Sequence, residues 1–371
     1  MLAPASEAEM AEAVAAATGP LAVRGGGTRG PAAPGEVLST AALSGVTLYE
    51  PGALTLVAQA GTPLAEVERA LAAEGQRLPF EPMDHRALLA TAGEPTIGGA
   101  VAANASGPRR IQAGACRDSL IGVRFVDGTG TVVKNGGRVM KNVTGYDLVK
   151  LMAGSRGTLG VLTEVAFKVL PAPAAAASLE LSGLSPEDAV AALSAALGAP
   201  FEVSGAAHLT EGPRTLVRIE GFEAQVDYRA GRLAEVLAPW GAAAVERDPA
   251  RIAETWAAVR DVTAFAGRPG DVWRISVRPS AGPAAHAALG APPAVMDWGG
   301  GLIWALLPQG RDARADLAGL AGHATLVRAD PATHARLGTL HPEPAALERL
   351  AAGLRARFDP RGLFAAGLQA A

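Results

Sequence analysis

A run of glycines directly after a short apolar segment restricts how the first thirty residues can fold. Leu21–Arg24 has the character of a strand, and it leads into the loop Arg24-Gly25-Gly26-Gly27-Thr28-Arg29-Gly30. Glycine tolerates positive φ, so successive backbone N–H groups can turn inward around an anion. The loop is not a Gly-x-Gly-x-x-Gly motif followed by a helix, so it does not fit the dinucleotide fingerprint. No Lys-Ser/Thr follows it, so it does not fit the P-loop either. The loop indicates a pyrophosphate site, or, taken alone, a tight surface turn.

A second stretch of small residues narrows these alternatives. Residues 96–107 read Thr-Ile-Gly-Gly-Ala-Val-Ala-Ala-Asn-Ala-Ser-Gly. Gly98 and Gly99 would let the backbone lie against a flat ring or a diphosphate, and the alanines favour a short, closely packed helix. We expect the first N–H groups of this helix to favour a negative partner.

Length and composition limit the number of domains, the possible partners and the expected compartment. A chain of 371 residues suggests two domains, and its net charge of -3 gives no general attraction for nucleic acid or acidic lipid. The one cysteine, Cys116, excludes an internal disulfide, which makes the reducing cytoplasm the expected compartment. No segment reaches the roughly 18 apolar residues of a membrane span, so attachment to the inner face of the cell membrane would come only through a partner.

The first part of the chain predicts several well-marked elements. Ser6 and Glu9 predict a capping box for a helix that buries Met10 and Val14. Thr62 is expected to cap a second helix, with Pro63 at its first position and Gly75 as its stop. Strands are predicted at Leu54–Gln59, Val123–Val126 and Val161–Leu170, the last with one apolar face.

Pro171-Ala172-Pro173 is the strongest boundary in the sequence. Beyond it the expected order of elements is strand, helix, strand, strand, helix, and it occurs twice, which favours an antiparallel sheet backed by helices. The second copy includes a hairpin at 294–307 that turns at Gly299-Gly300-Gly301 and a helix near 311–321. A final helix from Pro344 would carry an apolar stripe and lead into a tail that returns to the first domain. The stripe consists of Leu347, Leu350, Leu354 and Phe358. The expected domains are 1–172, 173–340 and 341–371.

The motifs of the first domain, taken in order, resemble the FAD-binding domain of the vanillyl-alcohol oxidase and para-cresol methylhydroxylase (PCMH) superfamily. The resemblance implies an α+β fold: a PCMH-type FAD-binding domain of two subdomains, an antiparallel α+β cap domain, and a C-terminal tail packed on the first domain. The supporting motifs are 24–30, Thr96–Gly99, Asn104–Gly107, Arg117-Asp118, Val126-Asp127-Gly128 and the run from Gly154 to Glu164.

A narrower resemblance points to one branch of that superfamily. The segment Gly137–Leu148, the run Ser106–Arg110 and the tail Phe358–Phe364 are similar to the E subunit of bacterial glycolate oxidase. This implies FAD as cofactor and, as partners, a catalytic flavin subunit and an iron–sulfur subunit. The roles of Lys141 and Tyr146, in cofactor contact or in loop structure, stay open.

The resemblance also implies which residues hold FAD. The loop would bind the pyrophosphate, and Thr96–Gly99 and Ser106-Gly107 would follow the ribityl chain and flavin. Gly160 and Val161 would contact the adenosine side through backbone atoms. The expected cofactor residues are Arg24, Gly25, Gly26, Gly27, Thr28, Arg29, Gly30, Thr96, Ile97, Gly98, Gly99, Asn104, Ser106, Gly107, Arg117, Asp118, Gly160 and Val161.

The attachment of FAD is expected to be non-covalent. Covalent members of the superfamily place a histidine in the glycine-rich loop or a cysteine just before the Thr-Ile-Gly-Gly segment. Here the loop has Thr28 and Arg29, residues 85–95 contain no cysteine, and Cys116 is expected to be a buried thiol. The tail reads Leu363-Phe364-Ala365-Ala366-Gly367 where relatives commonly end in Asn-Pro-Gly, which weakens any role for it.

The sequence is less informative about catalysis. Oxidation of a 2-hydroxy acid needs a hydride acceptor, a base and a cation for the carboxylate. His334 and His341 have no acidic residue between them, and no metal site is expected. Arg274 and Arg278 fall on one face of a predicted strand, either as carboxylate ligands or as a solvated face. Four of the five tryptophans, Trp256, Trp273, Trp298 and Trp304, are expected to pack in cores rather than against the flavin.

Three functional hypotheses follow. The chain is the FAD-binding subunit of a glycolate oxidase, which oxidises glycolate to glyoxylate with its partner subunits. Alternatively it is an autonomous FAD-dependent 2-hydroxy-acid oxidoreductase, or a non-catalytic assembly subunit with a structural FAD. The missing metal motif favours the first and third.

Overall fold

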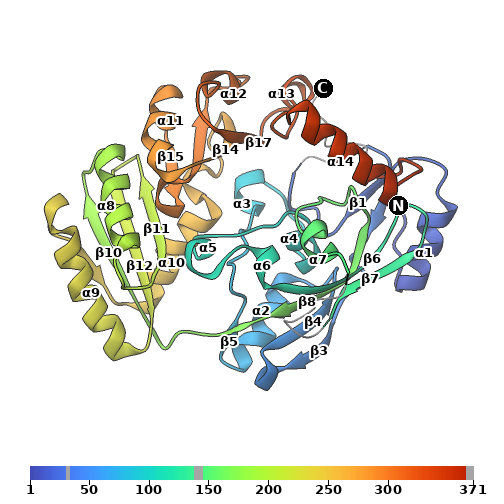
Figure 1. The fold of residues 1–371 in the computed structure, drawn as a ribbon, viewed down its shortest axis with the longest axis horizontal. Helices are drawn as coiled ribbons and strands as arrows, with labels where there is room; N and C mark the ends of the chain where they lie inside the picture. The colour runs from blue at the N-terminus through green and yellow to red at the C-terminus, as the bar shows by residue number, and fades with distance from the viewer. Residues whose placement is uncertain (31–33, 138–144, 365–371) are drawn as a thin grey trace. The chain divides into compact units, whose positions relative to one another are not determined.

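The computed structural model describes residues 1–30, 34–137 and 145–364, and these form two compact units (Figure 1). The first unit contains Met1–Ser106, Gly114–Ala172 and the chain from Pro342. The second unit contains Pro173–His341 together with a short excursion, Gly107–Ala113, which the sequence analysis had placed in the first domain.

The first unit is built on a five-stranded antiparallel sheet with strand order β3-β4-β8-β6-β7. The central strand β8 has buried residues on both faces. Val161, Val165 and Phe167 form the apolar face that the sequence predicted, and Leu162 and Ala166 are buried on the other. A separate parallel pair joins β1 (Leu21–Arg24) to β2 (Glu36–Ser39). The sheet strands are β3 Val46–Glu50, β4 Thr55–Gln59, β6 Leu120–Val126, β7 Val132–Gly136 and β8 Val161–Lys168.

Helix α1 (Glu7–Ala16) matches its prediction, with Met10 and Val14 fully buried. The Ser6 hydroxyl accepts the Glu9 N–H at 3.2 Å, but the Glu9 carboxylate takes the N–H of Ala5 rather than that of Ser6. The other helices of this unit are α2 Leu64–Ala73, α3 Arg86–Leu89, α4 Ile97–Ala102, α6 Cys116–Ser119, α7 Leu148–Met152 and α14 Ala345–Phe358.

The predicted cap of α2 is wrong. Pro63 precedes the helix and has no side-chain capping bond, while the hydroxyl of Thr62 donates to the carbonyl of Gln59 at 2.7 Å and accepts the Gly45 N–H. Thr62 therefore ties two loops together instead of starting the helix. The predicted stop is confirmed, because Gly75 follows the helix at φ +62°.

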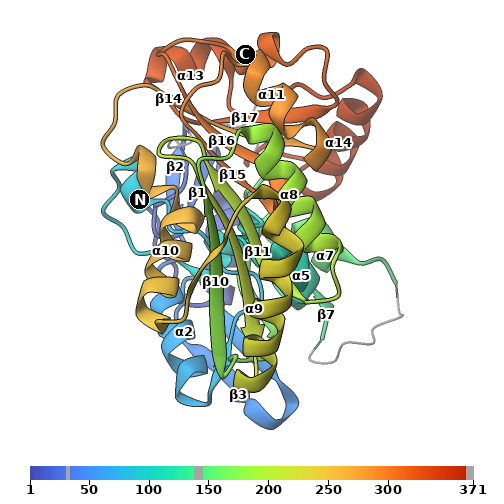
Figure 2. The ribbon, with the colours of Figure 1, turned by 90° about the vertical axis from the view of Figure 1, so that its left-hand side faces the viewer.

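The second unit contains an eight-stranded antiparallel sheet with the order β13-β10-β12-β11-β15-β16-β14-β17. Figure 2 shows α8 (Pro186–Gly198) and α9 (Glu223–Leu237) lying along the strands near β10 and β11. The strands are β10 Ala175–Ser182, β11 Val203–Leu209, β12 Arg214–Gly221, β13 Ala244–Glu246, β14 Asp271–Val277, β15 Ala294–Asp297, β16 Leu302–Leu307 and β17 Gly322–Arg328.

The predicted doubling of element order is present in this unit, since β10-α8-β11-β12-α9 is followed by β14-α11-β15-β16-α12. Helix α11 is Gly282–Ala288, and α12, expected near 311–321, is only Ala313–Asp316. Between the repeats α10 (Pro249–Asp261) begins at Asp248, whose carboxylate accepts two N–H groups. The sequence analysis did not predict α10 or α13 (Pro331–Leu337).

The end of the chain packs on the first unit, as predicted, but by a different set of residues. Leu363 and Phe364 join a core cluster with Met10 and Val14. The leucines of the predicted stripe on α14 are instead exposed, Leu350 at 67%. Phe358 is the stripe residue that packs inward, with its ring centre 6.0 Å from the ring centre of Phe125.

Candidate cofactor site

The two glycine-rich segments lie against each other at the end of β1. A Cβ on Gly25 would lie 2.6 Å from the Thr96 hydroxyl, and one on Gly26 would lie 1.6 Å from the carbonyl oxygen of Glu94. A Cβ on Gly93 would likewise lie 1.7 Å from the Gly26 carbonyl oxygen. Glycine is therefore required at these positions by the approach of the two loops, before any ligand is considered.

The backbone of the first loop retains its capacity to bind an anion. Within the described residues no hydrogen bond uses the N–H of Gly25, Gly26, Gly27 or Thr28, although Thr28 is only 4% exposed. Gly27 lies at φ +66°, the left-handed conformation that helps turn neighbouring N–H groups to one side. Gly25, Gly26 and Gly27 are half-buried, and N–H donors without a protein acceptor suit a ligand acceptor such as a pyrophosphate.

Arg24 adds a positive charge to the same loop. Its guanidinium lies over Gly27, where an added Cβ would be 2.3 Å from the Arg24 Nη2 atom. In the described part of the chain the side chain of Arg24 forms no hydrogen bond or ion pair. A guanidinium with its donors available suits a phosphate oxygen.

The second segment does not offer the anion site that its sequence suggested. Helix α4 has its first three N–H groups occupied by the protein: Ile97 donates to Thr62 O at 2.9 Å, Gly98 to Ala60 O at 2.8 Å, and Gly99 to the Thr96 hydroxyl at 3.1 Å. The expectation that these groups favour a negative partner is therefore wrong. The small residues serve close packing instead, since a Cβ on Gly98 would lie 2.6 Å from Ala60.

A third segment, Gly154–Gly160, reaches the same region. The N–H of Arg156 donates to the Ala102 carbonyl at the end of α4 (2.8 Å), and a Cβ on Gly157 would lie 3.4 Å from the Val23 side chain. The hydroxyl of Ser155 is buried without a hydrogen-bond partner among the described residues. Such an orphaned hydroxyl fits a polar ligand, and the sequence analysis had not assigned Ser155 to the site.

Gly160 and Val161 lie where only the backbone contact expected of them could occur. Val161 is fully buried in the cluster that contains Met10 and pairs in register with Val126. Gly160 has φ +150°, and a Cβ there would lie 2.7 Å from the Val126 carbonyl oxygen. Only their backbone atoms are therefore candidates for ligand contact.

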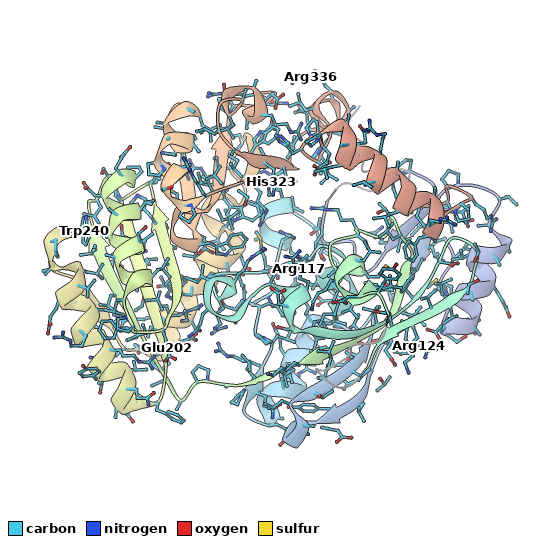
Figure 3. The ribbon with its side chains drawn as sticks, viewed as in Figure 1. Arg117, Arg124, Glu202, Trp240, His323 and Arg336 are labelled. Carbon is cyan, nitrogen blue, oxygen red and sulfur yellow. The ribbon has the colours of Figure 1, made fainter. Side chains whose placement is uncertain are left out.

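The residues Asn104, Ser106, Arg117 and Asp118 form one hydrogen-bonded turn. Asn104 Oδ1 accepts the Arg117 N–H at 3.1 Å, and the Ser106 hydroxyl accepts the N–H of Cys116 at 3.0 Å. Asp118 accepts the Ala115 N–H at 2.8 Å. The turn carries the exposed Arg117 side chain (Figure 3). These four polar residues thus have structural partners in the protein, whether or not they also contact a cofactor.

Lys150 supports this turn and was missed by the sequence analysis. Its ammonium group donates to the carbonyls of Arg117 and Leu120, the latter at 3.3 Å. Nothing in the pattern around Lys150 marks it, because its partners are backbone oxygens 30 or more residues away.

Gly107, the last residue of the predicted flavin segment, belongs to the second unit. Its carbonyl accepts the indole N–H of Trp298 at 3.1 Å. Its excursion continues through α5 (Arg110–Ala113), which packs on β11. The chain therefore changes units between Ser106 and Gly107.

Arg29 lies in the glycine-rich loop but is engaged by protein groups. Its Nη1 atom lies 3.0 Å from Nδ1 of His85. Cys116 is fully buried, and burial raises the pKa of its thiol far above the usual value. The cysteine is therefore an uncharged core residue, as expected from the sequence.

The two predicted carboxylate ligands of the second unit lie on one strand and just beyond its end. Arg274 lies on β14 with its guanidinium 5.3 Å from the ring centre of Trp298, and Arg278 keeps an extended backbone one residue beyond the strand. Their role as carboxylate ligands stays a prediction. Arg110 also lies over Trp298, at 4.6 Å.

The tryptophans of this unit mostly pack in its interior, with Trp256, Trp273 and Trp304 buried. The histidines of the second unit have protein partners. His334 lies 3.4 Å from the Thr339 hydroxyl, and His341 accepts the Ala324 N–H at 3.3 Å. No group of three or more metal-ligating side chains occurs within the described residues.

Lys141 falls outside the described residues. Tyr146 is 89% exposed, and its carbonyl oxygen accepts a hydrogen bond from the Asn135 side chain at 3.0 Å.

Comparison with known proteins agrees with this geometry. The sequence model of the FAD binding domain family matches residues 1–136, which include the glycine-rich loop and α4. The fold and this match define the chain as an FAD-linked oxidoreductase of the group that contains 2-hydroxy-acid dehydrogenases.

The chain is 35% identical over 357 residues to the glycolate oxidase subunit GlcE of Escherichia coli (strain K12), covering 94% of this chain and 92% of that protein. It belongs to the GlcE family. Two further relatives match over shorter stretches of longer proteins. D-lactate dehydrogenase of Anaerostipes hadrus is 34% identical over 157 residues, 42% of this chain and 31% of the relative. Glycolate oxidase subunit GlcD of Bacillus subtilis (strain 168) is 36% identical over 120 residues, 32% of this chain and 24% of the relative.

Solved structures support the fold of the whole chain. An alkyldihydroxyacetonephosphate synthase structure superimposes with a TM-score of 0.69 at 17% sequence identity, covering 98% of this chain and 76% of that one. The likeness confirms the predicted α+β fold, an FAD-binding domain followed by a large antiparallel sheet. Of the helices in the described ranges, none has the length and apolar character needed to cross a membrane.

Proposed function

We propose that this chain is the FAD-holding subunit of a glycolate oxidase complex, in which glycolate is oxidised to glyoxylate together with a catalytic flavin subunit and an iron–sulfur subunit. The observation that carries the proposal is the set of unused N–H groups at Gly25–Thr28 next to the available guanidinium of Arg24. Similarity to GlcE over nearly the full length of both proteins supports membership of such a complex.

FAD fits the residues present. The loop 24–30 would receive the diphosphate, and the buried Ser155 hydroxyl offers a further polar contact. The remaining expected contacts, at Thr96–Gly99, Asn104–Gly107, Arg117-Asp118 and Gly160-Val161, would act mainly through backbone shape, because their polar groups bond within the protein. When bound, FAD supplies two-electron acceptance from a substrate or relay of electrons to another centre.

We propose that FAD is held without a covalent bond, because the loop 24–30 contains no histidine and residues 85–95 contain no cysteine. Acid precipitation of the purified holoprotein tests this directly. All of the flavin is expected in the supernatant. Flavin that stays with the precipitate would contradict the proposal, and His85, whose ring reaches Arg29 of the loop, would be the first residue to replace.

The role of the subunit in turnover can be tested with glycolate. The lone chain is expected to be yellow and to keep its flavin absorbance when glycolate is added anaerobically, while the assembled complex is bleached. Bleaching of the lone chain at the rate of the complex would instead favour an autonomous 2-hydroxy-acid oxidoreductase.

A subunit with structural FAD gives a different result in the complex. A Gly26→Asp and Gly99→Asp double variant is expected to lose FAD, and in the proposed role the reconstituted complex then loses glycolate oxidation. Full activity of an assembled complex that lacks this FAD would favour the assembly role.

A further inference from the structure

Arg156 lies in a sharply turned segment beside the glycine-rich loop. The backbone angle φ is +90° at Gly154, +53° at Arg156 and +78° at Gly157. A non-glycine residue in this left-handed region is conformationally costly. Strained backbone conformations are common at ligand-binding sites, so Arg156 is a candidate ligand-binding residue.

The position of Arg156 connects it to both predicted cofactor segments. Its N–H donates to the Ala102 carbonyl at the end of α4. The next residue, Gly157, packs against Val23, which precedes Arg24 at the start of the loop. The residue before it, Ser155, contributes the buried hydroxyl that lacks a protein partner in the described ranges.

The charge of Arg156 has no counterpart among the residues that the structure describes. Its guanidinium makes no hydrogen bond, ion pair or ring contact with any described residue, and the same holds for Arg24. The side chain reaches solvent, yet desolvation by the surrounding protein lowers the pKa of Arg156. A guanidinium whose donors are available suits an anion that accepts its hydrogen bonds.

We propose that Arg156 is a second guanidinium for the diphosphate of FAD, acting beside Arg24; this rests on the proposed function. A diphosphate in ester linkage carries two negative charges, and the region offers two available guanidinium groups. The glycine-rich loop supplies neutral N–H donors, so the two arginines provide the charge balance. Arg156 would thereby set the affinity for the phosphate-bearing form of the flavin.

The test compares FAD binding by the apoprotein of the full chain with that of an Arg156→Gly variant. Glycine suits the positive φ, so the melting temperature of the apoprotein should not fall. Loss of a charge-assisted contact is expected to raise the Kd for FAD about 10- to 100-fold. Arg156→Lys keeps the charge but not the paired N–H donors of the guanidinium, so its Kd for FAD should lie between those of the wild type and Arg156→Gly.

Arg69 provides the matched control, since it is an exposed arginine on α2 of the same unit with no contact among the described residues. Arg69→Ala removes the same charge and should leave the Kd for FAD unchanged. An equal loss in both variants would mean that net charge, rather than Arg156, governs binding, and would overturn the inference.

Two further ligands locate the contact on the cofactor. ADP carries the diphosphate without the flavin, and riboflavin carries the flavin without phosphate. Arg156→Gly should weaken ADP in proportion to FAD and leave riboflavin unaffected. Weakened FAD with unchanged ADP would overturn the assignment to the diphosphate. Unchanged FAD binding in Arg156→Gly would overturn this inference alone, whereas a wild-type chain that binds no FAD would overturn the proposed function as well.

Discussion

Gly26 illustrates how closely single residues are constrained at the candidate site. We expect Gly26→Ala to destabilise the fold by about 1–3 kcal/mol or more, because its Cβ would lie 1.6 Å from a backbone oxygen of Glu94 and the two loops would have to separate. FAD binding should weaken with it. Thermal unfolding and flavin titration measure both effects.

Gly19→Ala is the control, because nothing lies within 4 Å of the position where its Cβ would be. It should change neither stability nor FAD affinity appreciably. If Gly26→Ala behaved like Gly19→Ala, the close approach of the two loops would be refuted.

His208 makes stability depend on pH in a predictable direction. It is fully buried, its Nδ1 lies 2.9 Å from the Thr215 hydroxyl, and its Nε2 has no partner among the described residues. Burial, with a smaller effect of His286, lowers the pKa of His208 from 6.5 to about 4. The unfolded chain therefore binds a proton more readily than the folded one between these values, so this contribution to stability is lost as the pH falls from about 6.5 to 4.

The expected loss from this histidine between pH 7.5 and pH 5 is about 2 kcal/mol. Urea unfolding of the wild type and of His208→Asn at both pH values would isolate it. The variant should be less sensitive to pH by that amount, whatever its baseline stability. Identical pH dependence of the two proteins would show that His208 does not titrate in this way.

At the scale of elements, α14 is anchored by the segment that follows it rather than by its leucine stripe. The Asp359 carboxylate accepts the N–H groups of Leu363 (2.9 Å) and Phe364 (2.7 Å), which places both side chains in the core. Leu363→Ala should therefore cost about 2–5 kcal/mol of unfolding free energy.

Leu350→Ala is the matched comparison on the same terminal region. Leu350 is 67% exposed against 4% for Leu363, so its replacement should change stability by less than about 0.5 kcal/mol. Denaturant unfolding of the two variants gives the difference. Equal losses would mean that the leucine stripe is covered in solution.

The elements show which sequence signals were sufficient. Ser6 with Met10 and Val14 predicted α1, and the glycines at 299–301 predicted the turn between β15 and β16, because these signals act over a few residues. The Thr62 cap failed since its hydroxyl donates to the carbonyl of Gln59, three residues earlier, and accepts the N–H of Gly45 from another loop. Sequence spacing cannot report such competition between distant partners.

At the candidate site, too, sequence spacing could not report contacts between distant residues. The glycines of 24–30 and 96–99 indicated two closely packed loops, and the structure brings them together. The sequence could not predict which of the two loops has N–H groups available for a ligand. Those of α4 donate to Ala60 and Thr62 elsewhere in the fold, whereas those of the first loop have no acceptor among the described residues. Ser155 and Lys150 were missed for the same reason: their significance depends on tertiary neighbours.

At the scale of the whole molecule, the excursion Gly107–Ala113 is fixed in the second unit by a buried ion pair. Arg109 donates to both oxygens of Glu220, at 2.8 and 2.6 Å, and the two side chains are 17% and 5% exposed. We expect Arg109→Met to cost about 3 kcal/mol, near the lower end for breaking a buried pair, because Arg218 remains 3.8 Å from Glu220.

The Arg214–Glu180 pair of the same unit is the control, since it has a similar bidentate geometry but side chains that are 43% and 29% exposed. Arg214→Met should cost less than about 1 kcal/mol. Urea unfolding of both variants tests the contrast, and a similar loss in each would mean that burial of Glu220 does not govern the stability of the excursion.

The excursion also limits how this protein can be recombined with its relatives. The chain passes between units after Ser106, Ala113, Ala172 and His341, so a single crossover at the Pro171–Pro173 boundary would join a foreign sheet to an α5 that evolved against another β11. Residues 107–113 have to be inherited together with 173–341. We therefore expect chimeras with relatives to fold only when this seven-residue segment and the sheet of the second unit come from the same parent.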